Sequence, residues 1–294
     1  MLVAVSIAVF VVARLSGDPA ALMVGDTGTV ADLARVRHLL GLDRPLTVQY
    51  GIFLAGVLHG DLGQSIFYAE PALPLVLARL PATAELAVTA LAVALAVGVP
   101  GGVFAALNRG RLGDWGFVAV AVLGQSVPGF VLGVLSVMLF VLDLHWLPAA
   151  GIGGWQHLCL PALTLAAFSC AKIARLTRTS VLDTLSRDYV RTAYAKGAAP
   201  RRVVWRHVFR NAALPVMTMA GLELGQLLSG VVITETIFGW PGVGLLSIDA
   251  INHRDYPLIQ AVALSVAVIF VVVNLVVDLA YGFVDPRIRY AGGA

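Results

Sequence analysis

Charge is scarce in this sequence, and so are cysteine and lysine. Only 13% of its 294 residues are charged, whereas 59% are hydrophobic and the mean hydropathy is +0.88. An ordinary soluble domain has about a quarter of its residues charged. A soluble core of this size cannot hide so many apolar side chains, because the surface of a globular protein must stay polar. The composition therefore excludes an ordinary soluble fold and predicts that much of the chain lies in lipid.

The patterns that would support catalysis or metal binding are also missing. Cys159 and Cys170 lie in one apolar run, where a helix would hold them about 16 Å apart, too far for a disulfide. The six histidines are scattered and never three or four residues apart. Neither Lys172 nor Lys196 follows a glycine, so the phosphate-binding loop of an ATPase is absent. We therefore expect no metal, no cofactor of its own and no enzymatic activity.

Long apolar runs are what the sequence has in abundance. A helix needs about 20 such residues to cross roughly 30 Å of hydrocarbon. The run at 158–171 reaches that length only if Lys172 and Arg175 extend toward the headgroups. The run at 1–13 would cover only about 20 Å, so we expect a clipped first span that begins upstream or continues to about Ser16. The predicted fold is an all-α transmembrane bundle with six spans: 1–13, 86–107, 115–142, 158–171, 212–234 and 258–277.

The distribution of basic residues predicts the orientation. Of the 20 lysines and arginines, 14 lie in one set of connections and 6 in the other, and the richer set should be cytoplasmic. Both termini are then cytoplasmic, in a multi-pass protein of the plasma (inner) membrane. Residues 14–82 form an outer region in which 29–40, with Thr29 or Asp32 near its start and Gly41 at its end, and 49–58 are expected to be helices.

The cytoplasmic connection at 177–211 carries eight basic residues and two acidic ones. A basic anchor on the inner side of the membrane would explain its charge alone. Its internal order suggests more, because 186–196 can form a short helix with Tyr189, Ala193 and Lys196 on one face and Gly197 as its stop. A small surface of this kind is suited to docking in a groove of another protein.

At these residues the sequence resembles the permease subunits of bacterial ABC importers, in the dipeptide/oligopeptide/nickel group. Arg191-Thr192-Ala193 and Gly197 align with the Glu-Ala-Ala and Gly of that family's cytoplasmic EAA motif. Arg191 replaces the Glu, and Leu214-Pro215 lies five residues beyond the usual Leu-Pro, two departures typical of this group. Further stretches agree: LGLDRPLTVQY at 40–50, GDLGQS at 60–65, LPATAELA at 80–87, GWPGVG at 239–244, RDYPLIQ at 254–260 and DPRIRY at 285–290.

The resemblance implies a complex and a division of labour within it. The partners would be a second permease, two cytoplasmic ATPases that hold ATP and Mg²⁺, and an extracytoplasmic substrate-binding protein, with no nucleic acid. Residues 1–294 would be one transmembrane domain, with its core at 83–284. The substrate would be a dipeptide or oligopeptide, with nickel or glutathione as the alternative. The motif helix would couple the ATPases to the spans through Ser186, Tyr189, Arg191, Thr192, Ala193, Tyr194, Lys196 and Gly197.

Polar residues inside the predicted spans are candidates for the substrate path, since each is costly in lipid. These are Gln125, Ser126, Glu223 and Asn274. Glu223 has two interpretations, an interhelical hydrogen bond made by the neutral acid or a pore-lining group that meets an amine or cation. Glu235 and Asp278 lie near span ends and are expected at the interface.

A secondary transporter or channel that needs no ATP is the rival hypothesis. It predicts a pair of polar, broken helices in symmetric positions, which the sequence does not show.

Overall fold

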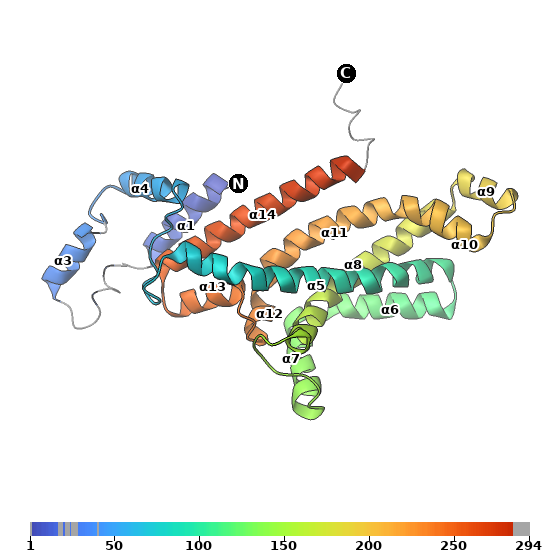
Figure 1. Cartoon of the computed structure of the whole chain (residues 1–294), viewed down its shortest axis with the longest axis horizontal. Helices are drawn as coiled ribbons and strands as arrows, with labels where there is room; N and C mark the ends of the chain where they lie inside the picture. The colour runs from blue at the N-terminus through green and yellow to red at the C-terminus, as the bar shows by residue number, and fades with distance from the viewer. Residues whose placement is uncertain (1, 17–19, 21–23, 25–28, 40, 285–294) are drawn as a thin grey trace, which may run out of the picture. The chain divides into compact units, whose positions relative to one another are not determined.

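The computed structural model describes the chain except for residues 1, 17–19, 21–23, 25–28, 40 and 285–294, and except for the side chains of 16, 39, 229, 230, 278 and 280–284. The DPRIRY stretch and the side chain of Asp278 thus lie outside the described residues. The described part is helical, as the composition predicts (Figure 1). Its elements are α1 (Leu2–Ser16), α3 (Val30–Leu39), α4 (Leu46–Leu58), α5 (Ala72–Leu107), α6 (Leu112–Ser126), α7 (Gly129–Ser136), η1 (Val137–Asp143), α8 (Trp155–Leu185), α9 (Asp188–Ala195), α10 (Pro200–Arg202), η2 (Val203–Phe209), α11 (Arg210–Gly230), α12 (Val232–Ile237), α13 (Val243–Asn252) and α14 (Tyr256–Val284).

Three of the predicted spans appear as helices long and apolar enough to cross a membrane, namely α5, α8 and α14. Each is longer than the uncharged run that predicted it, because helices continue past the hydrocarbon boundary. The run at 158–171 is part of α8, which passes through Lys172 and Arg175 to Leu185 without a break. The first predicted span is the shorter apolar helix α1.

The third predicted span, 115–142, is not one straight helix. It is divided between α6 and the α7–η1 segment, which are bent by 97° relative to each other. The break falls at Val127-Pro128, where Val127 is extended with φ −87° and ψ 122°. A proline disfavours the helical region for the residue before it and supplies no N–H, which favours a helix end at this point. An uncharged run alone carries no information about such a bend.

The fifth predicted span, 212–234, also differs in the structure. The helix α11 begins earlier, at Arg210, and ends at Gly230, after which α12 starts separately. Glu235 lies in α12 and is completely buried, and it accepts a hydrogen bond of 2.7 Å from the Thr83 hydroxyl. Glu235 therefore has a partner within the protein, and its position at the membrane interface stays a prediction.

The described chain divides into two compact units, whose boundaries fall within α5, between α12 and α13, and within α14. The first contains residues 1–82 and 241–271. Here α1 and α4 pack together through the ring of Phe10 against Tyr50 and Phe53, and Arg14 donates to the side chain of Gln49. These contacts fix α4 against the first apolar helix.

The two helices expected in the outer region are present as α3 and α4. At the start of α3, the hydroxyl and N–H of Thr29 donate to the Asp32 carboxylate, and the Asp32 N–H donates back to the Thr29 hydroxyl. This reciprocal cap satisfies N–H groups that a helix start leaves unpaired. The same bonds hold the pKa of Asp32 below its usual range. Gly41, with φ +64°, follows the helix as expected.

Two of the family-like stretches meet in the first unit. The buried carboxylate of Asp255, from RDYPLIQ, accepts hydrogen bonds from the hydroxyl of Ser65, from GDLGQS, and from the N–H of Phe67. Its second oxygen accepts the N–H of Leu258 in the first turn of α14. These hydrogen bonds thus connect two stretches that lie about 190 residues apart in the sequence.

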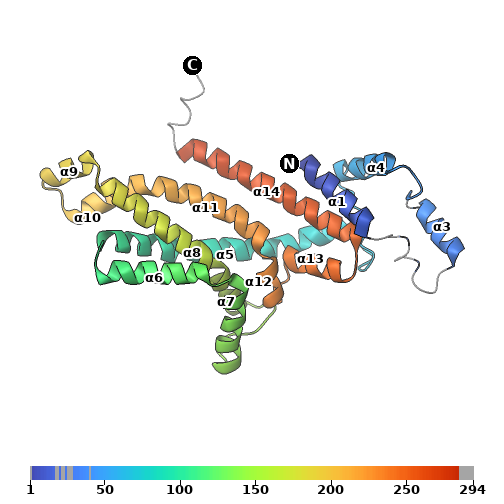
Figure 2. The same ribbon diagram turned by 180° about the vertical axis from the view of Figure 1, so that it is seen from behind.

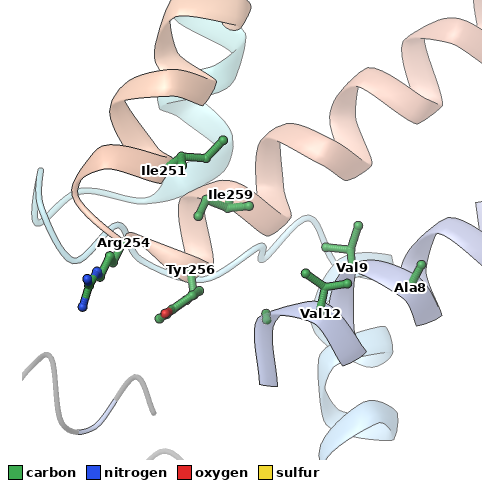
Figure 3. A pocket seen from close by; sticks show the side chains of 8 residues that line it. Ala8, Val9, Val12, Ile251, Arg254, Tyr256 and Ile259 are labelled. Atoms are coloured by element: carbon green, nitrogen blue, oxygen red, sulfur yellow. The ribbon is translucent and has the colours of Figure 1, made fainter. Parts of the chain in front are cut away.

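An apolar cavity of about 460 Å³ lies in the same unit, between α1 and the α13–α14 turn (Figure 3). The Arg254 guanidinium lies at its edge. The lining residues are Ala8, Val9, Val12, Ala13, Ile251, Arg254, Tyr256 and Ile259.

The second unit contains residues 83–240 and 272–294, and its centre is the packing of α8 against α5, α6 and α11. In both views α8 and α11 run side by side (Figure 1, Figure 2).

Two glycines one turn apart let α5 approach α8 closely. A Cβ at Gly98 would lie 2.9 Å from the Cys170 carbonyl oxygen, and one at Gly102 only 2.4 Å from that of Ala174. Small residues at this spacing are the usual means by which membrane helices pack.

Candidate functional site

The cytoplasmic connection contains the predicted helix, as α9. It ends at Ala195, followed by Lys196 and then Gly197 with φ +76°. The N–H of Gly197 donates to the carbonyl of Tyr194 and that of Ala198 to the carbonyl of Ala193. This is the pair of bonds of a Schellman motif, which favours glycine because only glycine adopts a positive φ without steric cost. The predicted stop at Gly197 is confirmed.

The start of this helix and its inner face differ from the prediction. Ser186 belongs to the end of α8, where its hydroxyl donates to the Asp183 carbonyl, and α9 starts only at Asp188. The face that packs inward is formed by Val190, which is 1% exposed, and by the half-buried Ala193. Ala193 therefore does not share an outward face with Tyr189 and Lys196, which are both exposed.

A compact apolar cluster attaches α9 to the ends of the long helices. Val190 packs into it together with residues from α5, α8, η2 and α11. Its buried members are Val103, Ala106, Val181, Val190, Val203, Val204, Val208 and Ala212. Close-packed interiors transmit displacement, because they leave no free volume to absorb it. A force on α9 would therefore act on the helix ends to which it is attached.

The other coupling candidates lie on the exposed side of α9 or beside its two ends. All are exposed: Ser186, Tyr189, Arg191, Thr192, Tyr194, Lys196 and Gly197. Tyr189 and Tyr194 are 44% and 43% exposed. Tyrosine and arginine are residue types that protein interfaces favour, and Tyr189, Arg191 and Tyr194 are all exposed here.

Inside the membrane domain, Glu223 lies in an interhelical cluster. Its carboxylate accepts 2.6 Å from the Ser169 hydroxyl and 2.8 Å from the Lys172 ammonium. The Lys172 ammonium also donates to the side-chain oxygen of Gln226, at 3.2 Å, and lies 4.6 Å from the ring centroid of Phe168. Lys172 thus turns toward α11 rather than extending to the headgroups as expected. The sequence offered a signal for this pair, because Lys172 and Glu223 each stand beside or within an apolar run and carry opposite charges.

The remaining path candidates do not join that cluster in the same way. Ser126 is exposed at the end of α6, and its hydroxyl donates to the Val122 carbonyl of its own helix. The side-chain nitrogen of Gln125 is buried and has no partner among the described residues. Asn274 is half-buried on α14. Glu223 therefore stands in a polar cluster between α8 and α11, whereas the Ser126 hydroxyl bonds within its own helix.

Neither a metal site nor a disulfide occurs in the described part of the chain. No three His, Cys, Asp or Glu side chains there could hold a metal ion, and Cys159 and Cys170 are free.

Sequence reasoning missed a second interhelical ion pair, near the cytoplasmic connection. The guanidinium of Arg178, on α8, donates twice to the carboxylate of Asp114, at 2.7 and 2.8 Å. Asp114 stands in the first turn of α6 and also accepts the N–H of Gly110. Both residues lie at ends of apolar runs, and only their three-dimensional proximity identifies them as partners.

Comparisons with known proteins agree with this architecture. The family described as "Binding-protein-dependent transport system inner membrane component" matches residues 98–290, and its N-terminal counterpart matches 1–87. A probable peptide ABC transporter permease of Sinorhizobium fredii is 42% identical, over 97% of this chain and 94% of its own length. A glutathione transport system permease of Salmonella choleraesuis is 43% identical, over 99% and 94%.

Solved structures show the same fold at low sequence identity. The methionine ABC transporter MetNI in an inward-facing conformation has a TM-score of 0.61 at 16% identity, over 72% of this chain and 96% of that one. An amino acid ABC transporter has a TM-score of 0.55 at 17% identity, over 71% and 93%. The chain therefore belongs to the family of binding-protein-dependent transport system inner membrane components and is a multi-pass permease subunit of an ABC importer.

Proposed function

We propose that this permease subunit forms half of a path through which ATP hydrolysis drives the uptake of short peptides, either dipeptides or oligopeptides. The single observation that carries the substrate class is the 42% identity to a probable peptide permease over nearly the whole length of both chains. Glutathione is the second candidate, since a glutathione permease is equally similar. Because glutathione is itself a tripeptide, both candidates have an amine and carboxylates.

The complex in this proposal has five parts. A second permease completes the path, two cytoplasmic ATPases hold ATP and Mg²⁺, and an outer binding protein delivers the substrate. The family description supports a binding protein, and the absence of a phosphate-binding loop in this chain supports separate ATPases. In this arrangement α9 docks in a groove of one ATPase with the exposed Tyr189, Arg191 and Tyr194.

Coupling follows from how α9 is attached. When the ATPases close, they displace α9, and the cluster around Val190 passes that displacement to the ends of α5, α8 and α11. The long helices then rock between inward-open and outward-open states as rigid bodies. The rival secondary transporter would need no such attachment.

The proposal is tested by reconstituting the chain with the second permease, the ATPases and the binding protein in liposomes. We expect uptake of dialanine or glutathione that requires ATP, Mg²⁺ and the binding protein. Uptake that proceeds without ATP would support the secondary transporter instead, and uptake of neither compound would exclude a short-peptide importer.

Substitution of Gly197 by valine should uncouple transport from ATP hydrolysis. A Cβ at this position meets nothing within 4 Å, so the cost is the positive φ alone, about 1 kcal/mol or more. That strain displaces the end of α9. We expect uptake to fall at least several-fold while the variant still inserts and pairs with its partner.

Gly110 offers a matched control for this substitution. Its φ is +77° and its Cβ position is equally open, but it lies in the turn between α5 and α6. Gly110→Val should therefore carry the same backbone cost and keep its substrate-stimulated ATPase activity. Equal uptake by the Gly197 variant and the parent protein would remove Gly197 from the coupling mechanism.

The proposed orientation is tested by labelling single cysteines. In a background with Cys159 and Cys170 replaced by alanine, Leu58→Cys should react with an impermeant thiol reagent added outside intact cells. Ala199→Cys should react only after the membrane is opened. Both positions are exposed in the structure, so burial does not limit the reaction. The opposite sidedness would reject the assignment of the basic connections to the cytoplasm.

A further inference from the structure

One face of α8 becomes polar toward its cytoplasmic connection. Exposed or half-exposed residues recur every three or four positions along the helix, which places them on a single face. They are Phe168, Lys172, Arg175, Thr179 and Asp183. An exposed face on α11 has the same spacing and three polar members, in the series Asn211, Pro215, Thr218, Leu222 and Gln226.

The two faces join at Lys172, which bonds to both Glu223 and Gln226 of α11. The side chain of Lys172 is 24% exposed, but that of Glu223 is only 3% exposed. The lysine is thus the accessible member of the ion pair. Gln226 and the ring of Phe168, which is 46% exposed, flank it on the surface.

The polar groups around Lys172 stand far from the ends of α8 and α11 that are joined through α9, α10 and η2. Lys172 and Glu223 lie about 20 Å along the helix axes from Leu185, the last residue of α8, and Arg210, the first residue of α11. Charged groups well inside a span almost always face a partner or a water-filled cavity. The polar faces of both helices continue from Lys172 down to the connection, as expected for a path that opens to the cytoplasm.

We infer that Lys172 binds the carboxylate of the peptide as it crosses the membrane, with Glu223 as the fixed counter-ion that holds the ammonium in place. The carboxylate would take the position of the Gln226 oxygen, so the buried Glu223 keeps its partner throughout and no isolated charge is left in the span. The exposed ring of Phe168 offers an apolar neighbour for the side chain of the substrate.

This assignment rests on the proposed function, and it explains how one path can accept varied peptides. Side chains differ between peptides, whereas a terminal carboxylate is common to all of them and to glutathione. An ammonium with three donors can bind that group from several directions. A weak and exchangeable contact of this kind also permits release.

Three variants of the reconstituted transporter separate substrate binding from a structural role. Lys172→Arg keeps the charge and the pair. Lys172→Gln/Glu223→Gln removes both charges together, which avoids leaving one buried charge alone. Lys172→Glu/Glu223→Lys keeps an ion pair between α8 and α11 but places the carboxylate at the accessible position. Each is assayed with saturated binding protein, using dialanine or glutathione as the free acid and as its carboxyl-blocked ester.

The expected result is a change in preference between the two forms of the substrate. Lys172→Arg should keep the parent's ratio of free-acid uptake to ester uptake. The neutral pair, Lys172→Gln/Glu223→Gln, should lower that ratio at least tenfold. The exchanged pair, Lys172→Glu/Glu223→Lys, should lower it further while the subunit still assembles with the second permease. Rescue of the parent's ratio by the exchanged pair would overturn the inference, because a purely structural ion pair depends only on opposite charges.

Two other results would also overturn it. If the neutral and exchanged pairs both lose the second permease on purification, the polar face is a subunit interface and not a path. If the parent transports neither dialanine nor glutathione, the proposed function itself fails, and this outcome is distinct from an unchanged ratio in an active transporter.

Discussion

A valine at position 102 is expected to separate α5 from α8 and to prevent a stable subunit from forming. Its Cβ would lie 2.4 Å from the Ala174 carbonyl oxygen and 2.7 Å from the Cβ of Thr177. The nearest obstructing atom is main chain, so no side-chain rotation can relieve the clash. We expect a cost of at least about 3 kcal/mol, the upper end of what overpacked cores show.

The measurement is the melting temperature and yield of the purified complex. Gly102→Ala should already lower both, and Gly102→Val should lower them more, since the added methyl groups enlarge the clash. Gly116→Ala is the control, because a Cβ at this helical position meets nothing within 4 Å and alanine has the higher helix propensity. A melting temperature of Gly102→Val equal to that of the parent would contradict the packing of α5 on α8.

Local chemistry explains which parts of the fold could be predicted. The cap at Thr29 and Asp32 and the stop at Gly197 depend on residues within a few positions of each other, and both are present as expected. The bend at Val127-Pro128 had a local signal too, but an uninterrupted apolar run obscured it. Hydropathy averages over a window, so it identifies membrane-length segments and not the direction of the helix within them.

The orientation of α9 shows where local reasoning ends. Tyr189, Ala193 and Lys196 lie close together on a helical wheel, and the sequence favoured them as one outward face. The structure turns Ala193 inward, because Val190 finds its apolar partners in η2 and α5. Those partners belong to other elements, so the sequence of a single helix carries no information about them.

The buried ion pairs show the same limit for the candidate site. The sequence identified Glu223 as a costly group but left open what satisfies it. The structure supplies Ser169 and Lys172, on a helix more than fifty residues earlier. Such pairing follows from helix register, and the register of α8 against α11 is set by packing contacts such as those of Ala166 and Ile173 with Val216 and Leu227.

The Arg178–Asp114 pair gives the other large expected effect. Replacing Arg178 by methionine would leave the Asp114 carboxylate, whose side chain is 7% exposed, without its cation. Removing one member of a fully buried pair costs about 3 to 5 kcal/mol. Because 26% of the Arg178 side chain is exposed, water offsets part of this cost, and we expect a loss on the order of 2 to 3 kcal/mol.

A double-mutant cycle separates the pair from the packing of its side chains. Asp114→Asn keeps an acceptor for the Gly110 N–H, and Asp114→Asn/Arg178→Met should recover most of the stability that Arg178→Met loses, since no buried charge remains. Arg175→Met is the matched control on α8, because Arg175 is exposed, and it should change stability by less than about 0.5 kcal/mol. The free energy of unfolding of the detergent-solubilised complex is measured for all four variants. Additive losses in the double variant would show that the two side chains contribute independently and that the ion pair does not join α6 to α8.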